Sequence, residues 1–194
     1  MKKYLIALAA MLMATPAMAH INPAEHASFS TGFLHPLSGA DHILAMVAVG
    51  LWAAQLGGRA LWAVPATFVI VMTAGFGASL TGIPLPFIEP AIAASVVVLG
   101  LLALMAFKVP TPIGMVVVGF FALFHGFAHG SELGEASAPP FLIGFALATA
   151  LLHAAGVLLG PAIARLAGDK AGRFITRSAG GLTALAGLAL IVGG

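Results

Sequence analysis

Hydrophobic residues in this chain form long runs separated by short segments rich in glycine and proline. An apolar run of about 20 residues is long enough to cross the hydrocarbon core of a bilayer as an α-helix. Runs close to this length occupy residues 36–56, 60–80, 87–107, 112–130, 140–166 and 174–192. The pattern therefore predicts an all-α membrane protein with six transmembrane helices.

The first 19 residues have the pattern of a secretory signal peptide. Lys2 and Lys3 precede a short apolar run at residues 5–14, and an Ala-x-Ala motif ends at Ala19. The run is too short to span a bilayer comfortably. We predict cleavage after Ala19, which makes residues 20–194 one six-helix membrane domain with His20 as its first residue.

Composition narrows the class of protein further. The chain is 61% hydrophobic and 7% charged, whereas soluble domains carry about 25% charged residues, so a soluble enzyme is excluded. The formal net charge of +2 provides no basic surplus for nucleic acid. Without cysteine, the seven histidines and few carboxylates are the available strong metal ligands or proton carriers.

Cationic residues beyond the signal peptide occur in alternate loops of the predicted six-helix domain. They are Arg59, Lys108, Arg165, Lys170, Arg173 and Arg177. Lysine and arginine collect in cytoplasmic loops, so these loops face the cytoplasm and both mature termini lie outside. We predict a multi-pass protein of a bacterial inner membrane, with its N-terminus in the periplasm and the lipid bilayer as its surroundings.

The start of the first predicted span carries His35, Asp41 and His42. In a regular helix the two histidines are about 10 Å apart along the axis, which predicts successive positions rather than one compact site. Pro36 and Gly39 nevertheless permit a departure from regular geometry. A carboxylate inside a membrane helix costs several kcal/mol unless it meets a proton, cation or partner, so we expect Asp41 to be functional.

The fourth predicted span ends with a second histidine motif. His125 and His129 are one helical turn apart, so their imidazoles can chelate one divalent ion, and Glu132 continues the stripe if the helix persists. The alternative is that both histidines form structural hydrogen bonds to neighbouring helices. The spacing resembles a metalloprotease HExxH only superficially, because Gly126 replaces the catalytic glutamate.

The predicted topology brings the two motifs together. His42 and His125 lie at similar depth, about 10 Å below the outer surface, whereas His35 and Glu132 lie near the mouth. His153 on the fifth span lies about 20 Å deep. We predict that it is either a further ligand or the partner of a structural hydrogen bond with the threonine one turn earlier.

Together, the two motifs resemble those of the HupE/UreJ family of nickel permeases. The matching patterns are His35-Pro-x-x-Gly39-x-Asp41-His42 and His125-Gly-x-x-His129-Gly-x-Glu132. The resemblance covers essentially the whole mature chain and implies nickel uptake for hydrogenase or urease assembly, with cobalt in some relatives. It implies essential roles for the histidines and carboxylates of both motifs, and it matches His20 to the family's histidine-bearing outer terminus.

These observations predict a secondary permease or facilitator, not an enzyme, with Ni²⁺ or Co²⁺ as transported substrate and no permanent cofactor. Imidazole and carboxylate ligands suit nickel, cobalt and zinc, and no Walker A motif for nucleotide binding is present. The predicted metal ligands are His20, His35, Asp41, His42, His125, His129, Glu132 and His153. The alternatives are a cobalt permease of the same family and a haem-carrying membrane subunit, since histidines on facing helices also serve as axial haem ligands.

Overall fold

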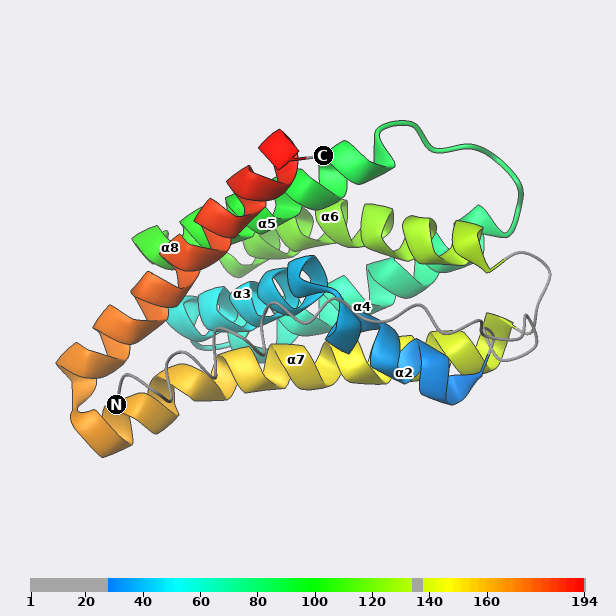
Figure 1. The fold of residues 1–194 in the computed structure, drawn as a ribbon. Coiled ribbons are helices and arrows are strands. Elements are labelled where there is room, and N and C mark those ends of the chain that lie inside the picture. The colour runs from blue at the N-terminus through cyan, green and yellow to red at the C-terminus, as the bar shows by residue number, and fades with distance from the viewer. Residues whose placement is uncertain (1–27, 134–137, 194) are drawn as a thin grey trace, which may run out of the picture.

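The computed structural model describes residues 28–133 and 138–193. The predicted signal peptide and His20 lie outside the described residues. Within them, every regular element is an α-helix (Figure 1). The helices are α2 (Phe29–Ser38), α3 (Ala40–Leu56), α4 (Ala60–Ser79), α5 (Ile88–Met105), α6 (Thr111–Glu132), α7 (Ala138–Ala167) and α8 (Asp169–Gly193).

The all-α membrane fold predicted from the apolar runs is confirmed. Helices α4 to α8 are each long and apolar enough to cross a membrane, and their bounds lie close to those of five predicted spans. Large apolar side chains remain exposed on their outer faces, including Ile70 (67% exposed), Phe120 (57%) and Leu182 (66%). Such a surface suits lipid rather than water.

The first predicted span differs from the expectation of one continuous helix. The structure has two helices there, α2 and α3, bent by 83° at Gly39. Gly39 has φ −97° and ψ 124°, which ends the helical hydrogen-bonding pattern. A Cβ atom at Gly39 would lie 2.6 Å from Oδ1 of Asp41, so glycine leaves room for this carboxylate at the break.

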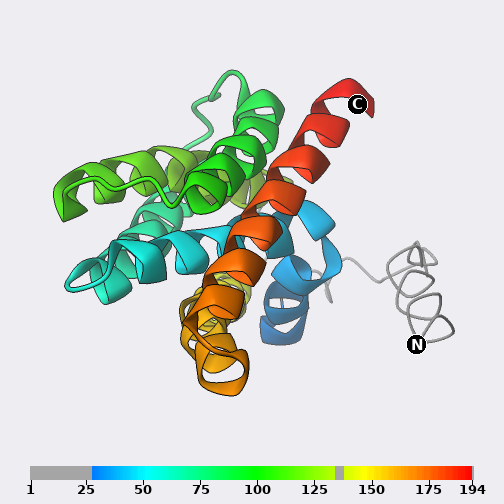
Figure 2. The same ribbon diagram turned by 90° about the vertical axis from the view of Figure 1, so that its left-hand side faces the viewer.

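Several helix pairs pack with their backbones in close approach. Helix α4 packs mainly against α6, α5 against α8, and α7 against both α2 and α3, and Figure 2 shows α8 running beside α5. Glycines occupy these crossings: a Cβ at Gly126 of α6 would lie 2.7 Å from the carbonyl carbon of Met72 on α4. Close approach through small residues is a common way for membrane helices to associate.

The two ends of the bundle differ in chemistry. His42 and Gln55 lie near opposite ends of α3, about 20 Å apart along the helix axis. Histidines gather at the end where α3 begins, whereas Lys108, Arg173 and Arg177 line a cavity at the end where α3 finishes. The bundle thus has a histidine-bearing end and a basic end.

Candidate metal-binding site

Three histidines from three helices converge at the histidine-bearing end. His35 comes from α2, His42 from α3 and His129 from α6, and one ring nitrogen of each lies within 4.8 Å of the others. The Nε2 atoms of His42 and His129 are 2.6 Å apart. His42 and His129 are buried, and His35 is half-buried. These residues, called the three-histidine group below, offer the compact set of nitrogen ligands that a divalent transition metal prefers.

The bend at Gly39 makes this group compact. The rings of His35 and His42 are 5.7 Å apart between centroids, so the expectation of two successive positions about 10 Å apart along one helix is wrong. The 83° turn between α2 and α3 folds His35 back toward His42 and brings its ring to 4.3 Å from that of His129.

Asp41 lies beside the three-histidine group and contacts one of its members. Its Oδ1 atom is 3.0 Å from Nδ1 of His42, while Nε2 of His42 faces His129. A carboxylate on one ring nitrogen fixes the orientation and tautomer of a histidine whose other nitrogen binds metal. Asp41 also occupies the first turn of α3, where the helix dipole stabilises a negative charge. The geometry therefore favours Asp41 as a residue that orients His42.

His125 lies next to the three-histidine group, as the depth estimate predicted. Its ring centroid is 5.3 Å from that of His42, and its side chain is fully buried. Nε2 of His125 is 2.9 Å from Oγ of Ser95, and Nδ1 has no hydrogen-bond partner among the described residues. His125 thus combines one structural hydrogen bond to a neighbouring helix with one nitrogen that is available for a ligand.

His153 is separate from the other histidines. Its ring packs 5.0 Å from Phe68, whose ring is also 5.7 Å from that of His125. The expected alternative of a hydrogen bond with Thr149 is wrong, because the Thr149 hydroxyl is directed to Sδ of Met72. Within the described part of the chain, both ring nitrogens of His153 are buried and lack a hydrogen-bond partner.

Two further predicted ligands lie at the limits of the described structure. Glu132 is the last residue of α6, so the helix does persist through Gly130 as the predicted stripe requires. Its side chain is outside the described part of the chain, as is the whole of His20. Both remain predictions.

Three residues that the sequence pattern did not single out belong to the surroundings of the histidines. Ser95 holds His125, Phe68 contacts both His125 and His153, and Phe145 packs 4.9 Å from the ring of His129. Ser95 could have been found from the sequence, because it is the single hydroxyl-bearing residue in the apolar run of α5. The two phenylalanines have no such signal, because aromatic residues are common throughout membrane helices.

The fold and the site together define a multi-pass helical membrane protein with buried histidines converging from several helices. The chain belongs to the HupE/UreJ family, whose description reads HupE / UreJ protein and whose sequence profile matches residues 8–190. It is 50% identical over 183 residues to "Protein HupE" of Rhizobium leguminosarum bv. viciae, an alignment that covers 93% of this chain and 94% of that protein. No solved structure gives a significant match.

Family membership confirms the resemblance drawn from the two motifs. The family is one of metal transporters associated with hydrogenase or urease rather than of enzymes. The chain is therefore a multi-pass membrane protein of a bacterial transporter family for nickel or cobalt.

Proposed function

We propose that this chain is a secondary permease or facilitator that takes up divalent nickel across the bacterial inner membrane for hydrogenase or urease assembly. The observation that supports this proposal most directly is the convergence of His35, His42 and His129, whose ligand nitrogens lie within 4.8 Å of one another. Imidazole nitrogen is a preferred ligand of Ni²⁺ and also of Co²⁺. Cobalt is accordingly the alternative substrate.

The proposed path begins at the three-histidine group and continues inward. An ion released from this group meets His125, whose ring lies 5.3 Å from that of His42. Phe68 contacts His125 and His153, so its ring is the barrier that an ion passes to reach His153. Conduction requires that an ion binds at each position strongly enough to enter and weakly enough to leave. Several ligand positions along the path allow the ion to pass from one to the next.

Residues 20–194 constitute the permease domain in this proposal, with the N-terminus in the periplasm. His20 and Glu132 are proposed as outer ligands from the match to the family's motifs. The distribution of cations supports this orientation, since Lys108, Arg173 and Arg177 lie at the opposite end from the three-histidine group. Cationic ends of membrane bundles usually face the cytoplasm.

The ring contacts favour a small ion over a haem. His42 and His129 have their rings 4.7 Å apart between centroids and their Nε2 atoms 2.6 Å apart. A haem with two histidine ligands needs its macrocycle between the two rings, and rings in direct contact leave no gap for it. We expect the purified protein to show no haem absorption bands in the visible spectrum.

Uptake of radioactive nickel, cobalt and zinc tests the proposed function. Cells that express the full chain are expected to accumulate nickel faster than cells with an empty vector. Added cobalt is expected to compete with nickel and to slow its uptake. The initial rates of the three metals, measured separately at equal concentrations, identify the preferred substrate. Accumulation equal to that of the empty vector for all three metals, at confirmed membrane abundance of the protein, would contradict the proposal.

The substitution Asp41→Asn is expected to reduce nickel uptake by about 10- to 100-fold, the usual cost of losing a residue that orients a metal ligand. It keeps the size of the side chain but removes the charge that holds Nδ1 of His42. Uptake is measured relative to protein abundance in the membrane.

Glu89→Gln is the matched control for this substitution. Glu89 is also a carboxylate in the first turn of its helix, α5. We expect this variant to retain wild-type uptake. An equal loss in both variants would show that general negative charge, and not the contact with His42, accounts for the effect.

A further inference from the structure

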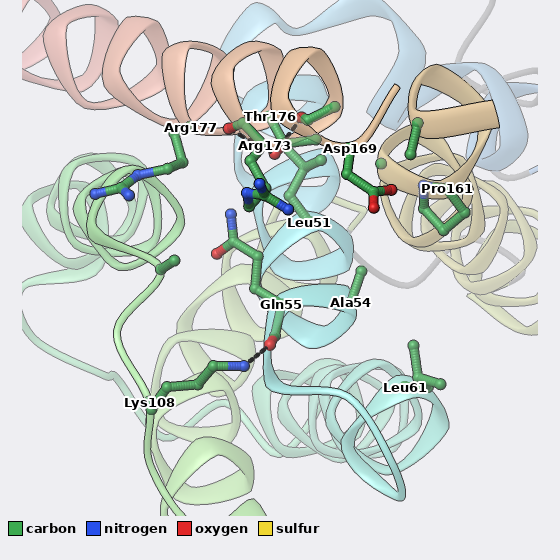
Figure 3. A pocket seen from close by; sticks show the side chains of 14 residues that line it. Leu51, Ala54, Gln55, Leu61, Lys108, Pro161, Asp169, Arg173, Thr176 and Arg177 are labelled. Atoms are coloured by element: carbon green, nitrogen blue, oxygen red, sulfur yellow. Dashed lines mark hydrogen bonds between the residues drawn. The ribbon is translucent and has the colours of Figure 1, made fainter. Parts of the chain in front are cut away.

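A second candidate binding site lies at the basic end of the bundle. A cavity of about 390 Å³ opens there between α3, the start of α4, α7, α8 and the segment that follows α5. Figure 3 shows Lys108, Arg173 and Arg177 around this cavity, with Gln55 between them. The lining also includes apolar side chains, among them Leu51 and Leu61. The cavity is therefore lined by both cationic and apolar side chains.

The charges around the cavity are predominantly positive. Lys108, Arg173 and Arg177 contribute three cations, against the one carboxylate of Asp169. Lys108 donates to the backbone carbonyl of Gln55, and Nε of Arg177 donates to the carbonyl of Leu104 at 2.7 Å. These bonds hold two of the cations in place at the rim while each keeps further N–H groups for a ligand.

Arg173 is the cation with the greatest capacity for a ligand. No salt bridge within 4.0 Å joins it to Asp169 or to any other carboxylate in the described ranges 28–133 and 138–193. Its guanidinium is directed toward Gln55 and the interior of the cavity in Figure 3. A guanidinium matches the geometry of phosphate oxygens through paired N–H donors.

We propose that this cavity binds a phosphate group, either that of an anionic membrane phospholipid or free inorganic phosphate. The excess of cations disfavours a divalent metal ion, so this site is distinct from the histidine path. Basic pockets between membrane helices on the cytoplasmic side recognise anionic lipid headgroups in this way.

The surroundings of the cavity favour the lipid as the source of the phosphate. Leu61 lines the cavity and is itself 41% exposed, and Phe174, next to Arg173 along α8, is 72% exposed. Leu61 therefore brings the apolar lining of the cavity to the outer surface of the bundle, and Phe174 adds an exposed apolar side chain to α8 beside Arg173 in the sequence. A phospholipid can thus place its headgroup phosphate among the cations and its acyl chains along this surface.

Native mass spectrometry of the purified full chain tests the proposal. The protein is titrated with phosphatidylglycerol and, separately, with phosphatidylcholine of the same acyl chains. We expect preferential retention of phosphatidylglycerol by the wild type. Arg173→Gln is expected to weaken this binding about five-fold, the effect of one basic residue near an anionic lipid. Arg173→Lys keeps the charge but loses the paired N–H donors, so its binding is expected to lie between that of the wild type and that of Arg173→Gln.

Arg165→Gln is the matched control, because Arg165 is an exposed arginine near the end of α7 that does not line the cavity. A second arm adds inorganic phosphate without lipid and measures the melting temperature of the wild type and of Arg173→Gln. Free phosphate would be identified as the ligand if the wild type shows no lipid preference and if inorganic phosphate raises the melting temperature of the wild type but not that of Arg173→Gln. Absence of both effects, or an equal loss of lipid binding in Arg165→Gln, would overturn the proposal.

Discussion

His42→Ala is expected to reduce nickel uptake at least about 100-fold while leaving the protein abundant in the membrane. His42 is the central member of the three-histidine group: its Nε2 is 2.6 Å from Nε2 of His129, and its Nδ1 is held by Asp41. Removing a direct ligand costs more than the 10- to 100-fold loss that follows removal of an orienting residue. The measurement is the initial rate of radioactive nickel uptake, normalised to protein abundance.

Ser38→Ala is the control for disturbance of the helix break. Ser38 lies on the other side of Gly39, is exposed, and donates to the backbone carbonyl of His35 at 2.7 Å. Its hydroxyl supports the end of α2 but is not a member of the three-histidine group. Ser38→Ala is expected to keep most of the uptake. Wild-type uptake in His42→Ala, or an equally severe loss in Ser38→Ala, would contradict the assignment of His42 as a metal ligand.

Gly126→Ala is expected to destabilise the folded protein by about 1–3 kcal/mol, the typical cost of forcing extra volume into a packed interior. The added Cβ would lie 2.7 Å from the carbonyl carbon of Met72 and 2.9 Å from the backbone nitrogen of Phe76. Both contacts are with the backbone of α4, which cannot move aside without separating the two helices. The melting temperature of the purified protein in detergent is expected to fall, together with its abundance in the membrane.

Gly77→Ala provides a matched comparison on α4, because a Cβ at Gly77 would meet no heavy atom within 4 Å. Alanine is favoured over glycine within a helix by up to about 1 kcal/mol, so this variant is expected to melt at or above the wild-type temperature. Equal melting temperatures for the two variants would show that α4 and α6 are not in backbone contact at Gly126.

The sequence by itself determined the existence and approximate bounds of five of the seven described helices, α4 to α8. Helix formation in a membrane is a local requirement, because each apolar segment must satisfy its own backbone hydrogen bonds. Helices α4 to α8 could therefore be predicted from the length of each apolar run. The two histidine motifs were sufficient to indicate the family, since they depend on residue identity and spacing within single segments.

Only the tertiary structure decided how the histidines are grouped. Spacing along a regular helix placed His35 and His42 apart, whereas the 83° bend at Gly39 brings them into one group with His129. The sequence permitted this bend through Pro36 and Gly39, but its angle depends on how α2 and α3 pack against α7. Tertiary packing also decides the roles of Phe68 and Ser95. Phe68 of α4 contacts His125 of α6 and His153 of α7, and Ser95 of α5 contacts His125. The separation of these residues along the chain gives no information about their distance in space.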